Sequence, residues 1–224
     1  MPKAIIFDMD GLLLDTEILS FQSFVTTASH HRFIVSIDDY RQMIGLNAAS
    51  GIDILRRIIP AHLDATDFKD AWLAVYKTLL EGDVAVKVGA VSFLTHLENI
   101  GMPRAVATSS SGAKARMILQ KTGLLRYIPH VTGGDEVAAG KPAPDVYLDA
   151  AGKLGIDPGN CLALEDSSNG VTAALAAGMT VIQIPDLAPP HSPADPPRFH
   201  LAKSLHAAAS MLGLGIQVTK SNNP

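Results

Sequence analysis

The sequence predicts an α/β fold, a doubly wound parallel sheet with an inserted helical segment. Short, continuous apolar runs recur along the chain, and such runs are typical of strands buried on both faces of a parallel sheet. Segments with helical periodicity separate most of these runs, which is the alternation that a doubly wound sheet requires. One long stretch after the first run contains helical patterns only, which indicates an insert.

Five apolar runs of four to six residues are the expected strands, and they lie at residues 4–7, 104–108, 127–132, 160–164 and 180–184. The helix after Pro144 has apolar residues at i, i+3, i+4 and i+7 and ends at Gly155, because glycine readily adopts the left-handed conformation that closes a helix. A similar pattern ends at Gly178. A proline-rich loop is expected at residues 185–197, before a final helix at 204–212.

The helical insert is expected to comprise residues 16–84. One of its apolar helical faces contains Phe24 and another contains Trp72, so we interpret Trp72 as part of the core of the insert rather than as a platform for substrate. The remaining residues, 1–15 and 85–224, are expected to form the α/β core. We expect the insert to lie at the carboxyl edge of the sheet.

The composition excludes several classes of partner. The 224 residues include 18 Lys and Arg against 22 Asp and Glu, so there is no basic stripe for binding nucleic acid. Every apolar run is shorter than the roughly 18 residues that span a membrane, and the N-terminal residues lack the pattern of a signal peptide. We expect a cytoplasmic monomer without membrane contact. The single cysteine, Cys161, is expected to be a small buried apolar residue.

Polar side chains follow the first two expected strands. Asp8 and Asp10 come directly after the first strand, where open parallel sheets bind their ligands. Thr108, Ser109 and Ser110 follow the second strand and offer hydroxyl and main-chain N–H groups at the start of a helix, which suits an anion. Each group alone is equally compatible with a solvated turn or an ordinary helix cap.

A lysine and a second acidic pair complete the set. Lys141 lies between Gly140 and Pro142, which restrict its backbone, although a lone lysine here could also be an exposed structural residue. Glu165 and Asp166 end a later strand, and adjacent acids in such a place are costly unless a cation binds there. Carboxylates, hydroxyls and a lysine at one sheet edge are the groups needed for a Mg²⁺-assisted attack on a phosphoryl group.

Four segments resemble those of a known family, and they are Asp8-Met9-Asp10-Gly11, Thr108-Ser109-Ser110, Gly140-Lys141-Pro142-Ala143-Pro144-Asp145 and Leu164-Glu165-Asp166-Ser167. In order and spacing they resemble the four motifs of the haloacid dehalogenase superfamily, and most closely its β-phosphoglucomutase-like and sugar-phosphatase branch. The insert is similar to the helical cap of that family. The resemblance implies a Rossmann-like core and a phosphatase, a hydrolase that acts on a small-molecule phosphomonoester.

The resemblance also implies roles for the acidic residues. Asp8 would be the nucleophile that forms an aspartyl-phosphate. Mg²⁺ would be the cofactor, with Asp8, the main-chain carbonyl of Asp10 and Asp166 as metal ligands, and with Glu165 as a direct or water-mediated ligand. Asp10 would donate a proton to the leaving group and then act as general base for the hydrolytic water.

The phosphate-binding role falls, by the same resemblance, to the second and third motifs. Thr108 and the following amides, beginning with that of Ser109, would hold the transferred phosphoryl group. Lys141 would offset the negative charge of Asp8 and of the phosphate. Ser110 is a candidate contact to the substrate.

Hydrolase and mutase share all four motifs, so the insert must distinguish them. The mutases that resemble this chain carry a histidine in the helix after the first motif and an arginine in a loop of the cap, and the aligned positions here are Ser20 and Ala48. A mutase needs that second phosphate anchor, so its absence favours hydrolysis. Glu17 and Asn47 are the candidate contacts to substrate hydroxyls, although a helix-dipole glutamate and a turn asparagine would look the same. A sugar or polyol phosphate is the expected substrate class, with a β-phosphoglucomutase-type mutase as the alternative.

Two other classes use similar residues. The segment Gly133-Gly134-Asp135-Glu136-Val137 is similar to the signature of diguanylate cyclases, but that signature belongs on a hairpin, and here it leads into Gly140 and Lys141. A response-regulator receiver, a non-enzymatic phospho-acceptor signalling module, also combines Asp, Thr and Lys on a doubly wound sheet. Its acceptor aspartate ends a middle strand rather than the first, and it has no cap.

Overall fold

The computed structural model describes residues 1–44, 48–190 and 196–214 of the chain. Its contacts divide the chain into two compact units, Asp15–Ala85 and a core unit made of Met1–Leu14 and Val86–Pro224. The outgoing and returning chain lie side by side at the boundary. Leu14 forms an isolated bridge with Val86, and the N–H of Asp15 donates to the carbonyl of Ala85 at 2.9 Å.

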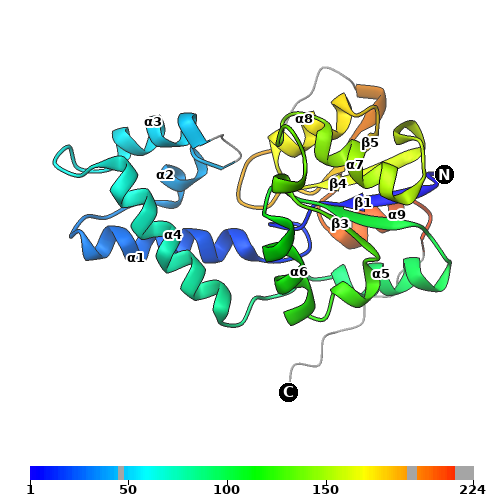
Figure 1. Cartoon of the computed structure of the whole chain (residues 1–224), viewed down its shortest axis with the longest axis horizontal. Helices are drawn as coiled ribbons and strands as arrows, with labels where there is room; N and C mark the ends of the chain where they lie inside the picture. The colour runs from blue at the N-terminus through cyan, green and yellow to red at the C-terminus, as the bar shows by residue number, and fades with distance from the viewer. Residues whose placement is uncertain (45–47, 191–195, 215–224) are drawn as a thin grey trace. The chain divides into compact units, whose positions relative to one another are not determined.

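The core unit is built on a six-stranded parallel sheet with strand order β3-β2-β1-β4-β5-β6 (Figure 1). The strands are β1 Ala4–Phe7, β2 Arg104–Ala107, β3 His130–Thr132, β4 Cys161–Glu165, β5 Thr180–Gln183 and β6 Phe199–Leu201. Every residue of β1, β2 and β4 is buried. The strand order reverses direction at β1, and ligands bind at the carboxyl ends of the strands at such a point.

Helices cover both faces of the sheet, which confirms the predicted α/β class with a doubly wound parallel sheet. The core unit contains α5 Ala90–Asn99, α6 Gly112–Lys121, α7 Asp145–Leu154, α8 Ser168–Ala176 and α9 Leu205–Met211. On one face, Ile6 of β1 belongs to the same buried cluster as Tyr147 of α7. On the other face, Phe7 packs edge-on against Phe93 of α5, with ring centroids 5.6 Å apart. None of the helices in the described part of the chain is long and apolar enough to cross a membrane.

The predicted strands agree with the structure except at two places. The sequence pattern places residues 127–129 in the third strand, which is wrong, because Leu125–Tyr127 forms a 3-10 turn and β3 begins at His130. The buried guanidinium of Arg104 donates to the carbonyl of Tyr127, so that carbonyl is occupied outside the strand ladder. β6 was not predicted, since two of its three residues are exposed and it lacks a continuous apolar run.

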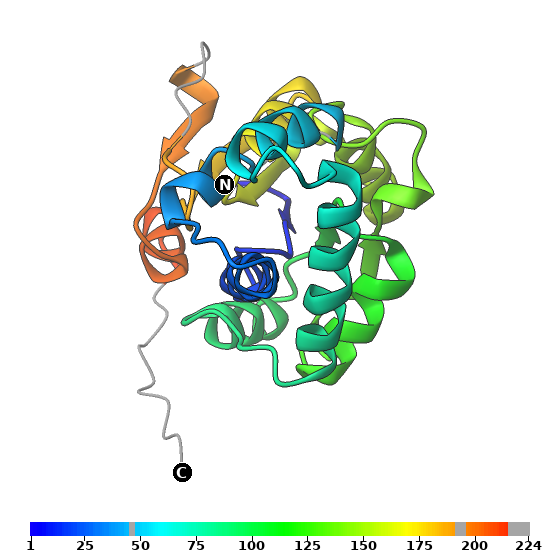
Figure 2. The same ribbon diagram turned by 90° about the vertical axis from the view of Figure 1, so that its left-hand side faces the viewer.

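The second unit is helical, as predicted, and has a core of its own. It contains α1 Thr16–His30, α2 Ile37–Arg41, α3 Ala48–Ile58 and α4 Ala65–Glu81, and Figure 2 shows α1 end-on in blue. Phe24 of α1 is fully buried, with its ring centroid 5.1 Å from that of Trp72 and 5.9 Å from that of Phe68 in α4. The indole N–H of Trp72 donates to the carbonyl of Ser20 at 3.0 Å. Trp72 is therefore a core residue of the insert.

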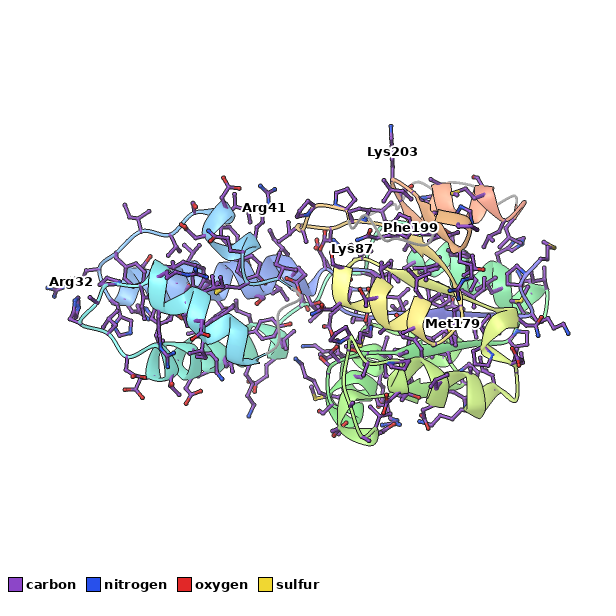
Figure 3. All side chains as sticks on the ribbon, turned by 90° about the horizontal axis from the view of Figure 1, so that it is seen from above. Arg32, Arg41, Lys87, Met179, Phe199 and Lys203 are labelled. Carbon is purple, nitrogen blue, oxygen red and sulfur yellow. The ribbon has the colours of Figure 1, made fainter. Side chains whose placement is uncertain are left out.

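The returning chain is tied to the end of β5 by an ion pair. The ammonium of Lys87, which Figure 3 labels, lies 2.6 Å from Oδ1 of Asp186, and both side chains are largely buried. The N–H of Lys87 also donates to the carbonyl of Leu13 at 2.9 Å. The segment that re-enters the core unit is thus bound both to the outgoing chain and to the loop after β5.

A network of charged residues joins β3, α6 and α7. Glu136 accepts from Arg116 of α6 at 2.7 Å and from Lys153 of α7 at 3.1 Å. Lys153 also lies 2.8 Å from Asp149, which accepts the hydroxyl of Thr132 in β3 at 2.7 Å. The hydrogen bond from Arg116, together with that from Lys153, lowers the pKa of Glu136 to about 2. The ionised form of Glu136 is therefore favoured in the folded protein.

Replacing Glu136 by glutamine should lower the free energy of unfolding at pH 7 by about 1 kcal/mol, because the ionised carboxylate is stabilised only in the folded state. A depressed pKa contributes stability above the pKa of the unfolded group, about 4.3, and the contribution disappears as the pH falls through the folded value of about 2. The difference between wild type and Glu136→Gln should therefore narrow from pH 7 to pH 3.5 in urea unfolding. A difference that stays constant with pH would contradict this account.

Candidate active site

The loops after β1, β2 and β4 bring most of the predicted site residues to one edge of the sheet. Asp8 follows β1, Thr108 follows β2, and Glu165 is the last residue of β4. The N–H of Asp8 donates to the carbonyl of Leu164 at 2.9 Å, and that of Thr108 donates to Thr132 at 3.0 Å. The parallel ladders thus continue past the strand ends and fix both side chains in place.

Lys141, in the loop before α7, joins Asp8 to Glu165. Its ammonium nitrogen lies 2.6 Å from Oδ1 of Asp8, 2.6 Å from Oε1 of Glu165 and 3.0 Å from the carbonyl oxygen of Ala107. Burial alone would lower the pKa of Lys141, but the charges of Asp8 and Glu165 outweigh burial and raise it. Lys141 is therefore a fixed positive charge beside Asp8. The Lys141-Pro142 peptide bond is cis.

Both carboxylate oxygens of Glu165 are taken by protein donors. Oε1 accepts from Lys141 and from the hydroxyl of Tyr147 at 2.7 Å. Oε2 accepts from the N–H groups of Asp166 and Ser167 at 3.0 and 3.1 Å. A Cβ on Gly170 would lie 1.7 Å from Oε1, so α8 approaches this carboxylate as only glycine allows. The structure thus shows Glu165 as a partner of Lys141, and a role as metal ligand would require that it release one of these bonds.

Asp10 is held by the loop after β2. Its Oδ2 accepts from the hydroxyl of Ser110 at 2.9 Å and from the hydroxyl of Thr108 at 3.2 Å. The N–H of Ser110 donates in turn to the Thr108 hydroxyl at 3.1 Å. Ser109 is exposed and makes no such contact with Asp10 among the interactions described for it. The structure therefore brings together Asp10, Thr108 and Ser110 but leaves Ser109 at the surface of the loop.

The oxygen donors at this edge fit a hard divalent cation. Asp8 and Asp166 are buried carboxylates at the ends of the neighbouring strands β1 and β4, and the main-chain carbonyl of Asp10 lies in the intervening loop. Within the described ranges, no three His, Cys, Asp or Glu side chains form a complete metal cluster. Mg²⁺ keeps several water ligands, so two carboxylates and a carbonyl suffice for it. Burial raises the pKa of Asp8, and the ammonium of Lys141 acts against that shift.

Of the two candidate substrate contacts in the insert, the structure describes Glu17 but not Asn47. The carboxylate of Glu17 accepts the hydroxyl of the buried Tyr40 at 2.6 Å, so part of its hydrogen-bonding capacity is used inside the insert. Burial and the charge of Glu17 raise the pKa of Tyr40, which keeps this hydroxyl a donor. Asn47 lies outside the described residues.

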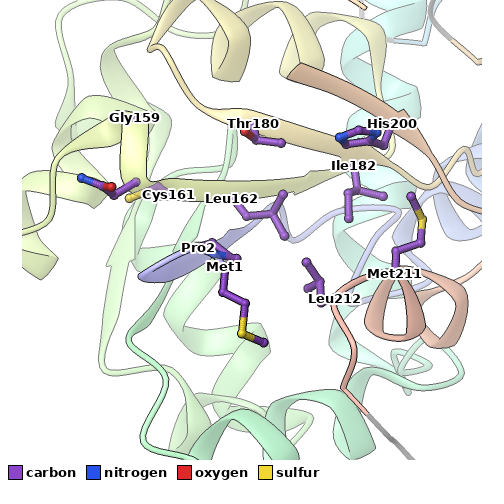
Figure 4. A pocket seen from close by; sticks show the side chains of 11 residues that line it. Met1, Pro2, Gly159, Cys161, Leu162, Thr180, Ile182, His200, Met211 and Leu212 are labelled. Atoms are coloured by element: carbon purple, nitrogen blue, oxygen red, sulfur yellow. The ribbon is translucent and has the colours of Figure 1, made fainter. Parts of the chain in front are cut away.

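A cavity at the opposite edge of the sheet contains none of the predicted site residues. It has a volume of about 400 Å³ and is lined by Met1, Asn160, Thr180 and Met211 among others (Figure 4). Cys161, which also lines it, is buried as predicted, and burial raises the pKa of its thiol to about 11. The predicted site residues that the structure describes are therefore not part of this cavity.

Sequence reasoning missed two residues of the site. Tyr147 begins the apolar pattern of the helix after Pro144, and that pattern does not indicate the bond of its hydroxyl to Glu165. Gly170 had no recognisable signal, because its importance depends on how closely α8 approaches Glu165. A tyrosine on the buried face of a helix is the one signal that sequence offers, since a buried hydroxyl needs a partner.

The model of the family described as "Haloacid dehalogenase-like hydrolase" matches residues 5–184, which includes all four motifs. The chain belongs to this family. It is a phosphatase of the branch close to CbbY, β-phosphoglucomutase and sugar-phosphate phosphatases. The phosphatases of this family generally need Mg²⁺.

Two curated relatives illustrate that branch. The chain is 33% identical over 221 residues to "Probable pseudouridine-5'-phosphatase" of Drosophila melanogaster, an alignment that covers 93% of this chain and 88% of the relative. It is 33% identical over 185 residues to the fructose-1-phosphate phosphatase YqaB of Escherichia coli, covering 80% of this chain and 95% of the relative.

A solved structure agrees with the fold. CbbY from Rhodobacter sphaeroides in complex with phosphate is 29% identical, with a TM-score of 0.75, and the match covers 96% of this chain and 99% of that one. The phosphatase therefore shares both its α/β core and its helical insertion after β1 with known members of the family.

Replacing Tyr147 by phenylalanine should lower the free energy of unfolding by about 1–2 kcal/mol, because it leaves the fully buried Glu165 carboxylate without one of its donors. The ring and its packing are kept, so the loss reports the hydroxyl alone. Urea unfolding of the two proteins at pH 7 measures it. An unchanged free energy of unfolding would show that the hydroxyl does not support Glu165.

Proposed function

We propose that this phosphatase hydrolyses a small sugar or polyol phosphate with Mg²⁺, through an aspartyl-phosphate on Asp8. The observation that carries the proposal is the pairing of two aspartates at the end of β1. Asp8 is held by a buried lysine at 2.6 Å, and Asp10, two residues later, is held by two hydroxyl groups. These contacts support the proposal that Asp8 is the nucleophile and that Asp10 is the acid and base.

The charge at this edge supports a metal requirement. Asp8, Asp10, Glu165 and Asp166 are four carboxylates, and Lys141 is the single lysine of the motifs. A bound Mg²⁺, held by Asp8, Asp166 and the carbonyl of Asp10, would supply the positive charge that lets a carboxylate approach a phosphate dianion. Lys141 supplies a second, permanent positive charge on the side of Glu165.

The first step transfers the phosphoryl group to the protein. A carboxylate oxygen of Asp8 attacks phosphorus and forms the new P–O bond while the bond to the substrate oxygen breaks. Asp10 in its protonated form gives its proton to that departing oxygen, and the alcohol leaves. Thr108, the amide of Ser109 and Lys141 are proposed to hold the phosphoryl oxygens.

The second step returns the enzyme to its starting state. Asp10, now ionised, takes a proton from water, and that water attacks the phosphorus of the aspartyl-phosphate. The bond between phosphorus and Asp8 breaks, which releases inorganic phosphate and restores the carboxylate. Asp10 ends the cycle protonated, so protons and charge balance.

The sugar-phosphate class is supported by the relatives, whose names specify pseudouridine 5'-phosphate and fructose 1-phosphate. We propose Glu17 and Asn47 as contacts to substrate hydroxyls, with Ser110 as a further contact from the core unit. Glu17 keeps acceptor capacity beyond its bond with Tyr40, because a carboxylate accepts several hydrogen bonds. A β-phosphoglucomutase-type phosphosugar mutase is the second candidate, since the resemblance extends to β-phosphoglucomutase. Ser20 and Ala48 stand where that class carries its histidine and arginine, which favours hydrolysis.

Phosphate release from a panel of hexose, pentose, glycerol, glycolate and pseudouridine phosphates tests the proposal. We expect turnover with Mg²⁺ and none with excess chelator, because the anionic nucleophile and substrate need the added charge. Asp8→Asn should lower turnover by roughly 10³-fold or more, since no other carboxylate can form the intermediate.

Each part of the proposal has its own contradicting result in this assay. Turnover in excess chelator would refute the metal requirement, and steady turnover by Asp8→Asn would refute the covalent intermediate. A catalytic amount of sugar bisphosphate added to a sugar monophosphate distinguishes the mutase. Release of phosphate supports the hydrolase, and formation of the isomeric monophosphate would reassign the enzyme.

Asp10→Asn should affect substrates according to their leaving groups. General acid catalysis contributes about 10²–10⁴-fold when the leaving oxygen needs a proton, as a sugar alkoxide does, whereas p-nitrophenolate leaves without one. The first step should therefore be slowed much less for p-nitrophenyl phosphate than for a sugar phosphate. Because Asp10 also activates water, the aryl substrate should show a burst of nitrophenol as phosphorylated Asp8 accumulates.

Rapid-quench measurement of the first turnover on both substrates decides the role of Asp10. Equal losses on the two substrates, without a burst, would show that the Asp10 side chain does not act as acid and base, and that role would be withdrawn.

A further inference from the structure

The glycine-rich turn after β3, residues 133–136, lies directly against the loop at residues 108–112 that follows β2. We propose that this turn is a clamp that positions the loop and, through it, the carboxylate of Asp10. The proposal rests on the acid and base role proposed above for Asp10. It makes Asp135 and Gly134 positioning residues, since neither contacts the reacting atoms.

Two hydrogen bonds join the turn to the loop. The N–H of Gly134 donates to the carbonyl of Ser110 at 2.9 Å. The N–H of Gly112, the first residue of α6, donates to Oδ1 of Asp135 at 2.7 Å. The loop is therefore bound at its middle by main chain and at its end by a carboxylate, which also suits the positive end of the α6 dipole.

The backbones of the turn and the loop are in direct contact. A Cβ on Gly133 would lie 2.1 Å from the nitrogen of Gly112, and one on Gly134 would lie 2.6 Å from the carbonyl oxygen of Ser109. Both obstacles are main-chain atoms, which cannot rotate away as a side chain would. The two glycines are therefore needed for the close approach. This requirement accounts for the Gly133-Gly134 pair, which is not part of the four family motifs.

The loop in turn holds the carboxylate of Asp10 by hydrogen bonds. Ser110, whose carbonyl is bound by the turn, donates its hydroxyl to Oδ2 of Asp10 at 2.9 Å. Its N–H donates to the hydroxyl of Thr108, which is the second donor to the same oxygen, at 3.2 Å. A shift of Ser110 would therefore move both donors that hold the carboxylate of Asp10.

The turn is itself held firmly. Glu136, its last residue, is bound by Arg116 of α6 at 2.7 Å and by Lys153 of α7 at 3.1 Å, and it accepts the N–H of Gly133 at 3.3 Å. Residues 134–136 form a 3-10 turn rather than the hairpin of the cyclase signature. Because Glu136 is bound to α6 and α7, these two helices fix the position of the turn, and the turn fixes the loop at residues 108–112.

Asp135→Ala tests the clamp, with Asp135→Asn as the conservative variant that keeps an acceptor oxygen. We expect Asp135→Ala to slow the first turnover of a sugar phosphate by about tenfold, because small displacements of a general acid are costly. The first turnover of p-nitrophenyl phosphate should change by less than about threefold, since that leaving group needs no proton. Asp135→Asn should restore the sugar phosphate rate to within about threefold of wild type.

Asp157→Ala is the matched control. Asp157 accepts the N–H of Gly159 at 2.8 Å, the same kind of carboxylate-to-glycine bond, but it precedes β4 at the opposite edge of the sheet. This variant should leave the ratio of the two substrate rates unchanged. Rates equal to wild type in Asp135→Ala would overturn the clamp. Equal losses on both substrates would overturn its action through Asp10, because a shift of Thr108 and Ser109, which are proposed to hold the phosphoryl group, slows both substrates alike.

Hydrogen exchange supplies a readout that does not depend on activity. The amides of residues 108–112 should exchange faster in Asp135→Ala than in wild type or Asp135→Asn, and unchanged exchange would overturn the clamp even if no substrate is ever found. Wild type that hydrolyses nothing while exchange changes as expected would instead refute the proposed function alone. If Asp135→Ala does not fold, Asp135→Leu gives the same comparisons, because its side chain has no acceptor oxygen for the N–H of Gly112.

Discussion

The buried ion pair of Lys141 with Asp8 and Glu165 is the interaction on which the rest of the core unit depends. Removing one member of such a group leaves an unpaired charge in the interior, which typically costs about 3–5 kcal/mol. The surroundings accordingly provide a donor for every oxygen of Glu165, including the hydroxyl of Tyr147. The helix α8 also packs closely against Glu165, since Gly170 has no side chain and leaves room for the carboxylate. The same ion pair group therefore contributes to the stability of the core unit and fixes the positions of the charges at the carboxyl edge of the sheet.

A second system of contacts holds Asp10 without using the first. Its carboxylate depends on Thr108 and Ser110, and their loop depends on neighbours from β3 and α6. The two aspartates are separated by a single residue, yet each accepts hydrogen bonds from its own donors, Lys141 for Asp8 and two hydroxyl groups for Asp10. Separate sets of donors suit the proposed division of roles, in which Asp8 attacks phosphorus and Asp10 exchanges a proton.

The sequence predicted the class of the fold and the strands near the site because those strands are continuous apolar runs. It failed where tertiary contacts override local pattern. The carbonyl of Tyr127 accepts a hydrogen bond from Arg104 instead of joining the sheet, and β3 begins only at His130. β6 is too exposed to resemble a buried strand. Of the predicted site residues, the structure brings Asp8, Asp10, Thr108 and Lys141 to one edge of the sheet, whereas the contact of Gly170 with Glu165 could not be predicted. Gly170 matters because α8 lies very close to Glu165 at the end of β4, and no local sequence pattern predicts the distance between these two elements.

The place where the insert leaves and rejoins the core unit has a consequence for how such a protein can diversify. Leu14 and Val86 are bridged to each other, so the insert begins and ends at nearly one point. Its aromatic core around Phe24 contains no residue of the catalytic motifs. Lengthening, shortening or rebuilding this segment therefore leaves the spacing of β1 and β2 unchanged. The insert can therefore vary as a module in evolution, while the spacing of the strands that carry the proposed nucleophile stays the same.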